Sequence, residues 1–522
     1  MRERSSPIYL LGIDVGTTGT RALILSQRGN VVVSATEEHE AFSSPQIGWA
    51  EQHPEDWWRA CIAATRKALA NANLTGKDIS CVGFSGQMHG AVMLDESARV
   101  VRPALIWCDT RSAKQSRDFT DKIGADRIIQ LTCNPALTNF TLTKFLWVRE
   151  VEPENWKRVR SVMLPKDYVR FCLTGERAID MADASGTLLL DVANRRWSSE
   201  ILEAAEIDQQ LLPTLYESTE ICGQISVAGA AATGLRVGTP VVAGAGDQAA
   251  GAVGMGITVP GAVSATIGSS GVVFAVTDRP LMDTKGRLHT FCHAMPGCWH
   301  VMGVTQSAGL SLRWFRDHFS TQKIKGSNGY EELIQEAAAV ETGSDGLLWT
   351  PYLMGERTPH LDPNARAALV GLTAFHGRGH VVRAILEGVA FSLKDTFMLL
   401  REMGVPINRI RLGGGGARSS LWRQIQADVY GQDVEVLEAE EGAALGAAIL
   451  AGVGAKAWPS VHEAGKAVVR ISERLQPNLA SEAVLNGSYA AYKRVYAATK
   501  SIFESELDFQ LTDTCEHQET AK

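Results

Sequence analysis

Apolar runs separated by short polar turns recur along this chain, and the first of them predicts a hairpin that suits a ligand. Residues 8–15 and 20–25 are apolar enough to be buried strands, and Gly-Thr-Thr-Gly at 16–19 forms the turn between them. The two glycines permit positive φ angles and let backbone N–H groups approach a phosphate closely. Asp14 lies just before the turn, where a carboxylate can hold Mg2+ against that phosphate. The alternative is an ordinary glycine-rich hairpin with one acidic residue.

The same pattern returns far along the chain. Residues 262–267 and 272–276 are again apolar, and Gly268-Ser269-Ser270-Gly271 joins them. An internal repeat of this kind predicts two related domains. One hairpin from each would grip the phosphates of a nucleotide across a cleft, as in the actin, hexokinase and Hsp70 class of ribonuclease H-like α/β folds. The sequence contains no GxxxxGK[ST] motif, so a Walker P-loop is not the interpretation.

Polar residues follow several predicted strands directly. The segment Ser85-Gly-Gln-Met-His-Gly90 comes after the apolar run 79–84, and Asp109 ends the run 104–108. Ligand contacts in α/β folds lie at such strand ends. His89 is therefore a candidate contact, although a lone histidine is more often structural. Asp109 is a candidate for binding sugar hydroxyls, because an ionised carboxylate accepts several hydrogen bonds.

Asp247 is the most informative carboxylate. It follows the predicted strand 239–243 and stands near the start of a helix, with glycine and alanine on both sides. A helix N-terminus favours the ionised form of a carboxylate. Simple capping is one interpretation. The small neighbours favour a second, in which a substrate approaches and Asp247 is the base for phosphoryl transfer to a hydroxyl.

The remaining periodicity predicts mainly helices. Apolar positions three and four residues apart indicate helices over 55–72, 381–403 and 420–430. Between the last two, Gly-Gly-Gly-Gly at 413–416 can receive a ribose or base against bare backbone. Residues 442–448 predict a helix of small residues suited to close packing.

Composition narrows the class of protein. A chain of 522 residues with 45% hydrophobic and 21% charged residues predicts two soluble globular domains, drawn at 1–257 and 258–505, with a polar tail at 506–522. A formal charge of −7 argues against a nucleic-acid partner. No run is long enough to span a membrane, and nine scattered cysteines indicate reduced thiols in the cytoplasm.

One group of metal-ligand residue types needs weighing. Cys292, His293, Cys298 and His300 lie within nine residues. Their spacing matches no common zinc motif, and strand alternation would send adjacent Cys292 and His293 to opposite faces. A zinc site is therefore the weaker alternative to ordinary packing.

These motifs together resemble the FGGY family of carbohydrate kinases, from residue 9 to about residue 496. Seven segments carry the resemblance: Gly12-Ile-Asp-Val-Gly-Thr-Thr18, Trp49-Ala-Glu-Gln-His-Pro-Glu-Asp-Trp-Trp58, Ser85-Gly-Gln-Met-His-Gly90, Leu164-Pro-Lys-Asp-Tyr168, Gly246-Asp-Gln-Ala-Ala-Gly-Ala252, Gly355-Glu-Arg-Thr-Pro359 and Gly414-Gly-Gly-Ala-Arg-Ser419. The resemblance implies a two-domain enzyme that uses ATP and Mg2+. The Gln-Met-His-Gly segment points to the branch that phosphorylates D-xylulose to D-xylulose 5-phosphate. A homodimer is also implied.

The resemblance implies a role for each matching residue. Asp247 is the catalytic base and, with Asp14, a metal ligand. The residues implied to bind the sugar are Met88, His89, Asp109, Asp247 and Gln248. Those implied to bind the nucleotide are Asp14, Thr17, Thr18, Gly268, Ser269, Ser270, Gly414, Gly415 and Arg418.

Alternatives of substrate and of class stay open. Cys108 and Gln248 stand where relatives often carry asparagine, Ser269 replaces a threonine, and Ala367 replaces a glycine. The first two are near the expected sugar, so another ketose or polyol such as ribulose or ribitol is an alternative substrate. A non-catalytic ATP-binding protein of the actin or Hsp70 type, or a regulator derived from a kinase, is the alternative of another class.

Overall fold

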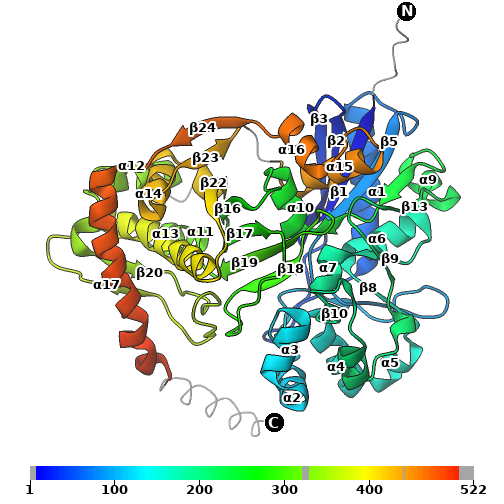
Figure 1. Cartoon of the computed structure of the whole chain (residues 1–522), viewed down its shortest axis with the longest axis horizontal. Coiled ribbons are helices and arrows are strands. Elements are labelled where there is room, and N and C mark those ends of the chain that lie inside the picture. Colours follow the sequence, from blue (N-terminus) through cyan, green and yellow to red (C-terminus); the bar gives the residue numbers. More distant parts are fainter. Residues whose placement is uncertain (1–7, 320–328, 439–440, 505–522) are drawn as a thin grey trace, which may run out of the picture. The chain divides into compact units, whose positions relative to one another are not determined.

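The computed structural model describes residues 8–319, 329–438 and 441–504, which form two compact α/β units (Figure 1). The N-terminal unit contains the chain as far as Pro260, the segment Val276–Val301 and the segment that ends at Arg470. The C-terminal unit contains the other described residues. Two later segments thus belong to the N-terminal unit, and each is separated from the preceding part of that unit by residues of the C-terminal unit. The tail predicted for 506–522 lies outside the described residues.

The N-terminal unit is built on a sheet with the strand order β13-β14-β5-β1-β2-β3, in which β15 also pairs with β5. Its strands are β1 (Tyr9–Val15), β2 (Gly19–Ser26), β3 (Val31–Glu38), β4 (Glu51–Gln52), β5 (Ile79–Gly86), β6 (Val92–Leu94), β7 (Ala104–Leu105), β8 (Ser161–Met163), β9 (Ala178–Asp180), β10 (Leu190–Asp191), β11 (Arg196–Trp197), β12 (Thr214–Tyr216), β13 (Ile221–Gln224), β14 (Pro240–Val242), β15 (Ala245–Gly246) and β18 (His289–Cys292). Its helices are α1 (Pro54–Asn71), α2 (Ala113–Ile123), α3 (Ala125–Thr132), α4 (Thr141–Val151), α5 (Pro153–Arg158), α6 (Pro165–Thr174), α7 (Met181–Ser185), α8 (Ser199–Ala205), α9 (Val227–Thr233), α10 (Asp247–Gly254), α15 (Gly442–Gly454) and α16 (Val461–Val468).

The sheet of the C-terminal unit runs, from β19 onward, in the order β19-β17-β16-β22-β23-β24. The strands of this unit are β16 (Gly261–Ile267), β17 (Gly271–Thr277), β19 (Trp299–Thr305), β20 (Leu348–Thr350), β21 (Ala368–Val370), β22 (Ile407–Gly414), β23 (Val434–Leu437) and β24 (Ile471–Leu475). Its helices are α11 (Gly309–Phe319), α12 (Gly329–Ala338), α13 (Arg378–Glu402), α14 (Ser420–Tyr430) and α17 (Leu479–Glu504).

The two sheets repeat one topology, which confirms the internal repeat expected from the sequence. In the first, β1 pairs antiparallel with β2 and parallel with β5, and β5 pairs parallel with β14. In the second, β16 pairs antiparallel with β17 and parallel with β22, and β22 pairs parallel with β23. Each glycine hairpin is therefore the first turn of an actin/hexokinase-like sheet.

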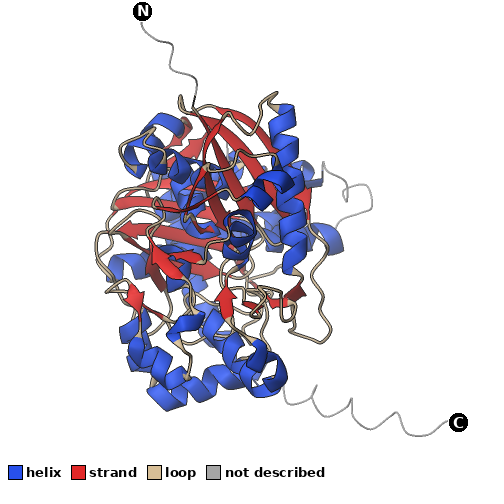
Figure 2. Ribbon diagram, turned by 90° about the vertical axis from the view of Figure 1, so that its right-hand side faces the viewer, coloured by secondary structure: helices blue, strands red, loops and turns tan. Residues whose placement is uncertain are grey.

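Helices lie against the strands of both sheets, as Figure 2 shows in blue and red. Helix α1 begins at Pro54, a residue whose missing N–H and fixed φ suit the first position of a helix. Its buried face, which includes Trp57, Cys61 and Ala64, joins the core beneath the sheet. The predicted helix over 381–403 is α13, and the one over 420–430 is α14.

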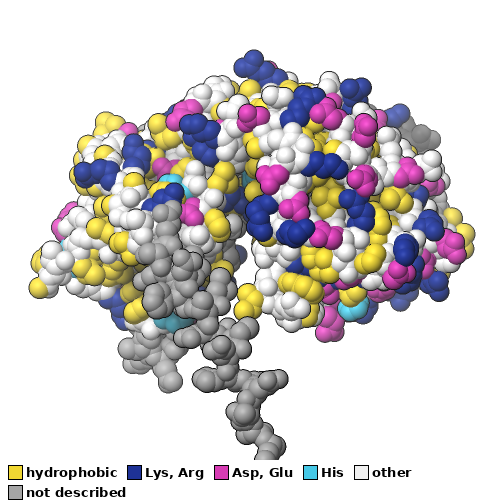
Figure 3. Space-filling model, turned by 90° about the horizontal axis from the view of Figure 1, so that it is seen from below, with side chains coloured by type: hydrophobic (Ala, Val, Ile, Leu, Met, Phe, Trp, Pro, Cys, Tyr) yellow, Lys and Arg dark blue, Asp and Glu magenta, His cyan; other side chains and the backbone are white. Residues whose placement is uncertain are grey.

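Side chains of both charges are interspersed over the face of the molecule that Figure 3 shows. Among the described residues, no helix has the length and hydrophobicity that crossing a membrane requires.

Helix α15 packs directly on bare backbone of the first sheet. A Cβ atom at Gly12 of β1 would lie 2.0 Å from the carbonyl oxygen of Ala444, and one at Gly83 of β5 would lie 2.1 Å from that of Ala447. A Cβ atom at Gly446, on α15 itself, would lie 1.8 Å from the carbonyl oxygen of Ala250 in α10. The small residues predicted for this helix are therefore required by backbone-to-backbone contact.

We expect Gly12→Ala to destabilise the protein by about 1–3 kcal/mol or more, because the new methyl group overlaps the α15 backbone. The lower midpoint of thermal unfolding is measured by scanning fluorimetry. Gly487→Ala is the matched control: nothing lies within 4 Å of its Cβ position in α17. A helical Gly→Ala change without a clash should stabilise by about 0.5–1 kcal/mol. Equal midpoints for Gly12→Ala and the wild type would refute the packing argument.

Candidate functional site

Three parallel strands of the N-terminal unit end side by side, and the candidate residues follow their ends. Ser85 of β5 is in register with Asp14 of β1 and with Ala245 of β15. The chain then continues from β1 into the Gly-Thr-Thr-Gly turn, from β5 into Gln87-Met88-His89, and from β15 into Asp247 and Gln248 of α10. Thr17 and Thr18 stand at the tip of the β1–β2 turn, where Thr18 is exposed. The structure thus brings to one sheet edge the segments that the sequence singled out separately.

The glycines around Asp247 serve packing rather than open space. Gly244 has a φ of +81°, and a Cβ there would lie 2.0 Å from the carbonyl oxygen of Phe84. A Cβ on Gly246 would lie 2.7 Å from Asp183 Oδ1 and 2.8 Å from Met88 Cγ. The expectation that these small residues leave room for a substrate is wrong for these two positions, since neighbouring atoms fill the space.

The pKa of the Asp247 carboxyl is shifted upward. Burial, together with the nearby charge of Asp14, raises its pKa to about 7, although its backbone and side-chain hydrogen bonds with Gln248 act in the opposite direction. Burial also raises the pKa of Asp14. The helix N-terminus, which the sequence was expected to use to favour the ionised form of Asp247, is therefore outweighed by desolvation and by the second carboxylate. A pKa near 7 suits a general base at neutral pH.

His89 is fixed in backbone and ring. Its φ is +66°, and its carbonyl oxygen accepts from Lys144 Nζ and from Thr141 Oγ1, each at 3.2 Å. Its Nδ1 lies 2.6 Å from the carbonyl oxygen of Gly186. A carbonyl can only accept, so Nδ1 carries a proton and donates it to this contact. The ring of Phe140 packs edge-on at 5.0 Å between centroids.

A cluster of fully buried charges lies behind this edge, and the motifs did not predict it. Lys166 Nζ is 2.6 Å from Asp167 Oδ1, 2.5 Å from Asp180 Oδ2 and 3.0 Å from Asp183 Oδ2. Arg170 is 3.0 Å from Asp167 Oδ1. The three carboxylates lie close enough together to hold a metal ion. The Lys166 ammonium group already provides the cation among them. The motif Leu164-Pro-Lys-Asp-Tyr168 was the available signal, but spacing alone did not reveal the aspartates that pair with it.

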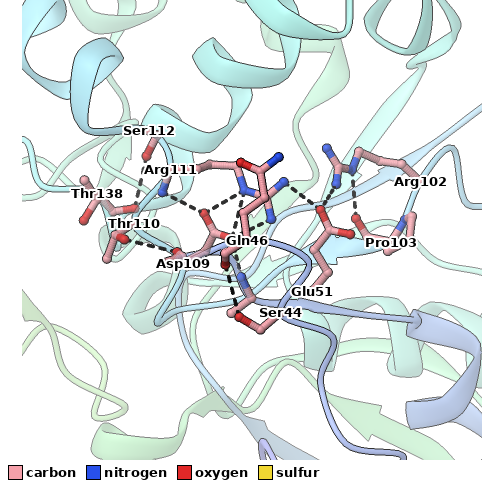
Figure 4. Close-up of polar contacts among 12 residues, drawn as sticks. Ser44, Gln46, Glu51, Arg102, Pro103, Asp109, Thr110, Arg111, Ser112 and Thr138 are labelled. Carbon is pink, nitrogen blue, oxygen red and sulfur yellow. Dashed lines mark hydrogen bonds and ion pairs between the residues drawn. The ribbon is translucent and has the colours of Figure 1, made fainter. Parts of the chain in front are cut away.

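Asp109 lies at the centre of a second buried network, drawn in Figure 4. Its Oδ1 accepts from the backbone N–H and Nε of Arg111, and its Oδ2 accepts from Arg111 Nη2 at 2.7 Å and from the N–H of Ala50 at 2.6 Å. The guanidinium carbon of Arg111 stands 3.7 Å from the ring centroid of Trp49. The predicted strand over 104–108 is only Ala104–Leu105, after which the chain turns. Both carboxylate oxygens are thus engaged by the chain, and the sugar contact of Asp109 stays a prediction.

The C-terminal unit brings its own candidates together. Ile267, the last residue of β16, is in register with Gly414, whose φ is +74°; a Cβ on Gly414 would lie 2.4 Å from the carbonyl oxygen of Ile267. The turn after Ile267 meets the start of α11, where Gly309 N–H donates to the Gly268 carbonyl oxygen at 2.8 Å. The candidates Gly268, Ser269, Ser270, Gly415 and Arg418 are exposed beside this contact. Arg313, which the sequence did not indicate, donates to Ser269 Oγ at 3.3 Å.

The cysteine and histidine group shows packing contacts. Cys292 Sγ lies 3.8 Å from the carbonyl oxygen of Val192, and burial raises the pKa of its thiol to about 12. The rings of His293 and His300 pack edge-on at 5.7 Å between centroids. Within the described ranges, the aspartate trio around Lys166 is the one group of His, Cys, Asp or Glu close enough to hold a metal ion.

Two repeated ribonuclease H-like sheets, each with a glycine hairpin, give the chain an actin/hexokinase-like fold. The family models that it matches place it in the class of ATP-dependent sugar kinases. Residues 9–254 match the model of the N-terminal domain of the FGGY family of carbohydrate kinases, and residues 263–455 match its C-terminal domain. The chain belongs to the FGGY family of carbohydrate kinases.

Individual relatives share most of their length with the chain. It is 38% identical over 494 residues to a xylulose kinase of Bacillus subtilis (strain 168), covering 95% of this chain and 98% of that protein. It is 41% identical over 454 residues to a xylulose kinase of Escherichia coli (strain K12), covering 87% and 91%. The crystal structure of xylulose kinase from Rhodospirillum rubrum matches with a TM-score of 0.88 and 29% identity, over 95% of this chain and all of that one.

We expect Asp247→Asn to stabilise the ligand-free protein, and more so at pH 8 than at pH 5. A carboxyl whose pKa rises from 3.8 to about 7 on folding binds its proton more tightly in the folded state, so stability is lost as pH rises between these values. The asparagine variant lacks this loss and should gain about 1–3 kcal/mol between the two pH values. The check is urea unfolding of both proteins at both pH values. A stability difference that does not change with pH would mean that the pKa is not raised.

Proposed function

We propose that this chain phosphorylates D-xylulose at the expense of ATP, giving D-xylulose 5-phosphate and ADP. The observation that carries the proposal is the common edge at which β1, β5 and β15 end: Asp14 lies near the end of β1, and Met88, His89 and Asp247 follow the ends of β5 and β15. Relatives named xylulose kinase, at 38% and 41% identity over most of the chain, support the choice of sugar.

Asp247 is the proposed base. In its ionised form it accepts the proton of the sugar hydroxyl as that oxygen attacks the γ-phosphate, and the pKa near 7 lets it do so at neutral pH. Met88 and His89 are the proposed sugar contacts, and the contact of His89 Nδ1 with the Gly186 carbonyl oxygen fixes the orientation of the ring. Gln248, beside Asp247, and Asp109 are the further proposed sugar contacts.

The two glycine hairpins are the proposed phosphate contacts, through backbone N–H groups and the hydroxyls of Thr17, Thr18, Ser269 and Ser270. Gly414, Gly415 and Arg418 are proposed for the adenosine end. Asp14 and Asp247 suit Mg2+, because carboxylate oxygens are the donors that this ion prefers and Asp14 Oδ1 is buried without a hydrogen-bond partner among the described residues. When bound there, the ion neutralises phosphate charge and draws both carboxyls toward their ionised forms.

The test of the substrate is ADP release with Mg·ATP against D-xylulose, L-xylulose, D-ribulose, L-ribulose, ribitol, D-arabitol, glycerol and D-gluconate. We expect D-xylulose to have the highest kcat/KM by about tenfold, which is about 1.4 kcal/mol of transition-state binding. A different best substrate would replace D-xylulose in the proposal and direct attention to Cys108 and Gln248. Nucleotide binding with no sugar-dependent ADP release would favour the non-catalytic alternative.

The test of the base is Asp247→Asn. We expect kcat to fall at least about a hundredfold, the low end for loss of a general base, with D-xylulose binding largely kept. Calorimetry gives the sugar affinity and the coupled assay gives kcat. Asp121→Asn, at an exposed position of α2, is the control and should leave both unchanged. Near-normal turnover of Asp247→Asn would refute the assignment.

We also propose that the protein works in the cytoplasm. All eight described cysteines are free thiols, which fits a reducing compartment. The homodimer implied by the family resemblance stays a prediction that sedimentation velocity would check.

A further inference from the structure

Two buried glutamines lie between the sugar-side segment and the turn of the first hairpin. Gln52, at the end of β4, and Gln87, directly after β5, are 5% and 1% exposed. Gln87 Nε2 donates to Gln52 Oε1 at 3.0 Å, and Gln52 Nε2 donates to the carbonyl oxygen of Thr17 at 2.8 Å. Gln87 Nε2 also reaches the carbonyl oxygen of Gly16 at 3.4 Å. The chain of contacts therefore runs from Gln87, next to Met88, to the two central peptide groups of the hairpin turn.

The partners leave one orientation for both amides. The carbonyl oxygens of Gly16 and Thr17 only accept, so both glutamines must direct their NH2 groups toward the hairpin. Trp57 Nε1 only donates, and it donates to Gln52 Oε1 at 3.2 Å. A flipped amide at Gln52 would place its NH2 group against that donor and its oxygen against an acceptor. The two side chains thus act as a fixed relay rather than as adaptable surface amides.

The relay sets which way the hairpin N–H groups point. A peptide group is planar and trans, so its C=O and the next N–H point in opposite directions. Holding the Gly16 and Thr17 carbonyl oxygens on the glutamine side therefore turns the N–H groups of Thr17 and Thr18 the other way. These are the donors that a phosphate would need. The ring of His39 also contacts the Thr17 carbonyl oxygen, at 3.4 Å, but the contact of Gln52 Nε2 with that oxygen is shorter, at 2.8 Å. Trp107 Nε1 donates to the Thr17 side chain instead, at Oγ1 and 3.0 Å.

Gln87 also belongs to the segment proposed to hold the sugar. Its N–H donates to the carbonyl oxygen of Val15 at 2.9 Å, immediately before the turn. Its side-chain Oε1 is buried and has no hydrogen-bond partner among the described residues, so the amide is held through its NH2 group alone. Backbone and side chain of Gln87 thus connect the residue next to Met88 with the hairpin turn.

We propose that Gln52 and Gln87 are positioning residues that orient the phosphate-binding turn and couple it to the sugar side of the site. The proposal rests on the proposed function for the identity of the two ligands. Neither glutamine is a catalytic residue; Gln52 acts only through Thr17 and Gln87.

The test uses Gln52→Met, Gln52→Glu and the control Gln115→Met in the full-length protein. Gln115 is also a buried glutamine of the N-terminal unit, 5% exposed, and its Nε2 donates to Glu150 Oε2 at 2.9 Å. Calorimetry measures the affinity of Mg·adenylyl imidodiphosphate, a non-hydrolysable ATP analogue, with and without saturating D-xylulose. Coupled assays give kcat at pH 6 and pH 8.

We expect Gln52→Met to bind the ATP analogue at least about fivefold more weakly than the wild type, the equivalent of one neutral hydrogen bond. The effect of D-xylulose on analogue affinity should shrink toward none, while the affinity for D-xylulose alone stays within about twofold. Gln115→Met should keep the wild-type values. Wild-type analogue affinity and wild-type coupling in Gln52→Met would overturn the proposal, as would an equal loss in the control.

Gln52→Glu separates positioning from mere packing. A buried carboxyl has a raised pKa, and once protonated it can donate to the Thr17 carbonyl oxygen. The ratio of its kcat to that of the wild type should therefore be higher at pH 6 than at pH 8, whereas the ratio for Gln52→Met should not change. The absence of this recovery would count against the relay. If the wild type phosphorylates none of the sugars, the proposed function fails, but the affinity for the analogue alone still decides the role of Gln52.

Discussion

The close approach of α15 to β1 and β5 is the contact on which the N-terminal unit depends. Helix and sheet meet there through backbone atoms, because Gly12 and Gly83 have no Cβ atom to keep them apart. Asp14 and Gln87 lie only a few residues beyond these two glycines, so the contact with α15 supports the strand ends that carry the candidate site.

Buried polar groups, rather than surface ones, define the rest of this edge. Lys166 and its aspartates lie behind Gly86 and Gly246, Lys144 holds the backbone of His89, and Arg111 holds Asp109. Each is costly to bury unless its partners are in place. Such groups therefore specify one arrangement, because any other leaves a charge unpaired. The same desolvation acts on Asp247, where the neighbouring charge is the carboxylate of Asp14, and the pKa rises.

The sequence predicted those features of the fold that residues close together in the chain determine. Both hairpins, the repeat and the helix over 420–430 follow from periodicity and turn residues, and the motifs that carry the family resemblance identified the candidate residues. The missed features depend on contacts between distant segments. Nothing near Lys166 in sequence reveals Asp180 and Asp183 as its partners, and the apolar run 104–108 reads as a strand although only its first two residues pair. The raised pKa of Asp247 was not predicted for the same reason, since burial is a property of the fold.

The interleaving of the two units has a consequence for synthesis. The chain leaves the ribosome from its N-terminus, and α15 emerges only after some 440 residues, so β1 and β5 wait through most of translation without the helix that covers their glycines. The N-terminal half therefore cannot complete its fold during synthesis before α15 has been made. Nascent chains of this protein should present an apolar sheet face to chaperones until the last segment docks, and a chain truncated before residue 442 would keep that face exposed.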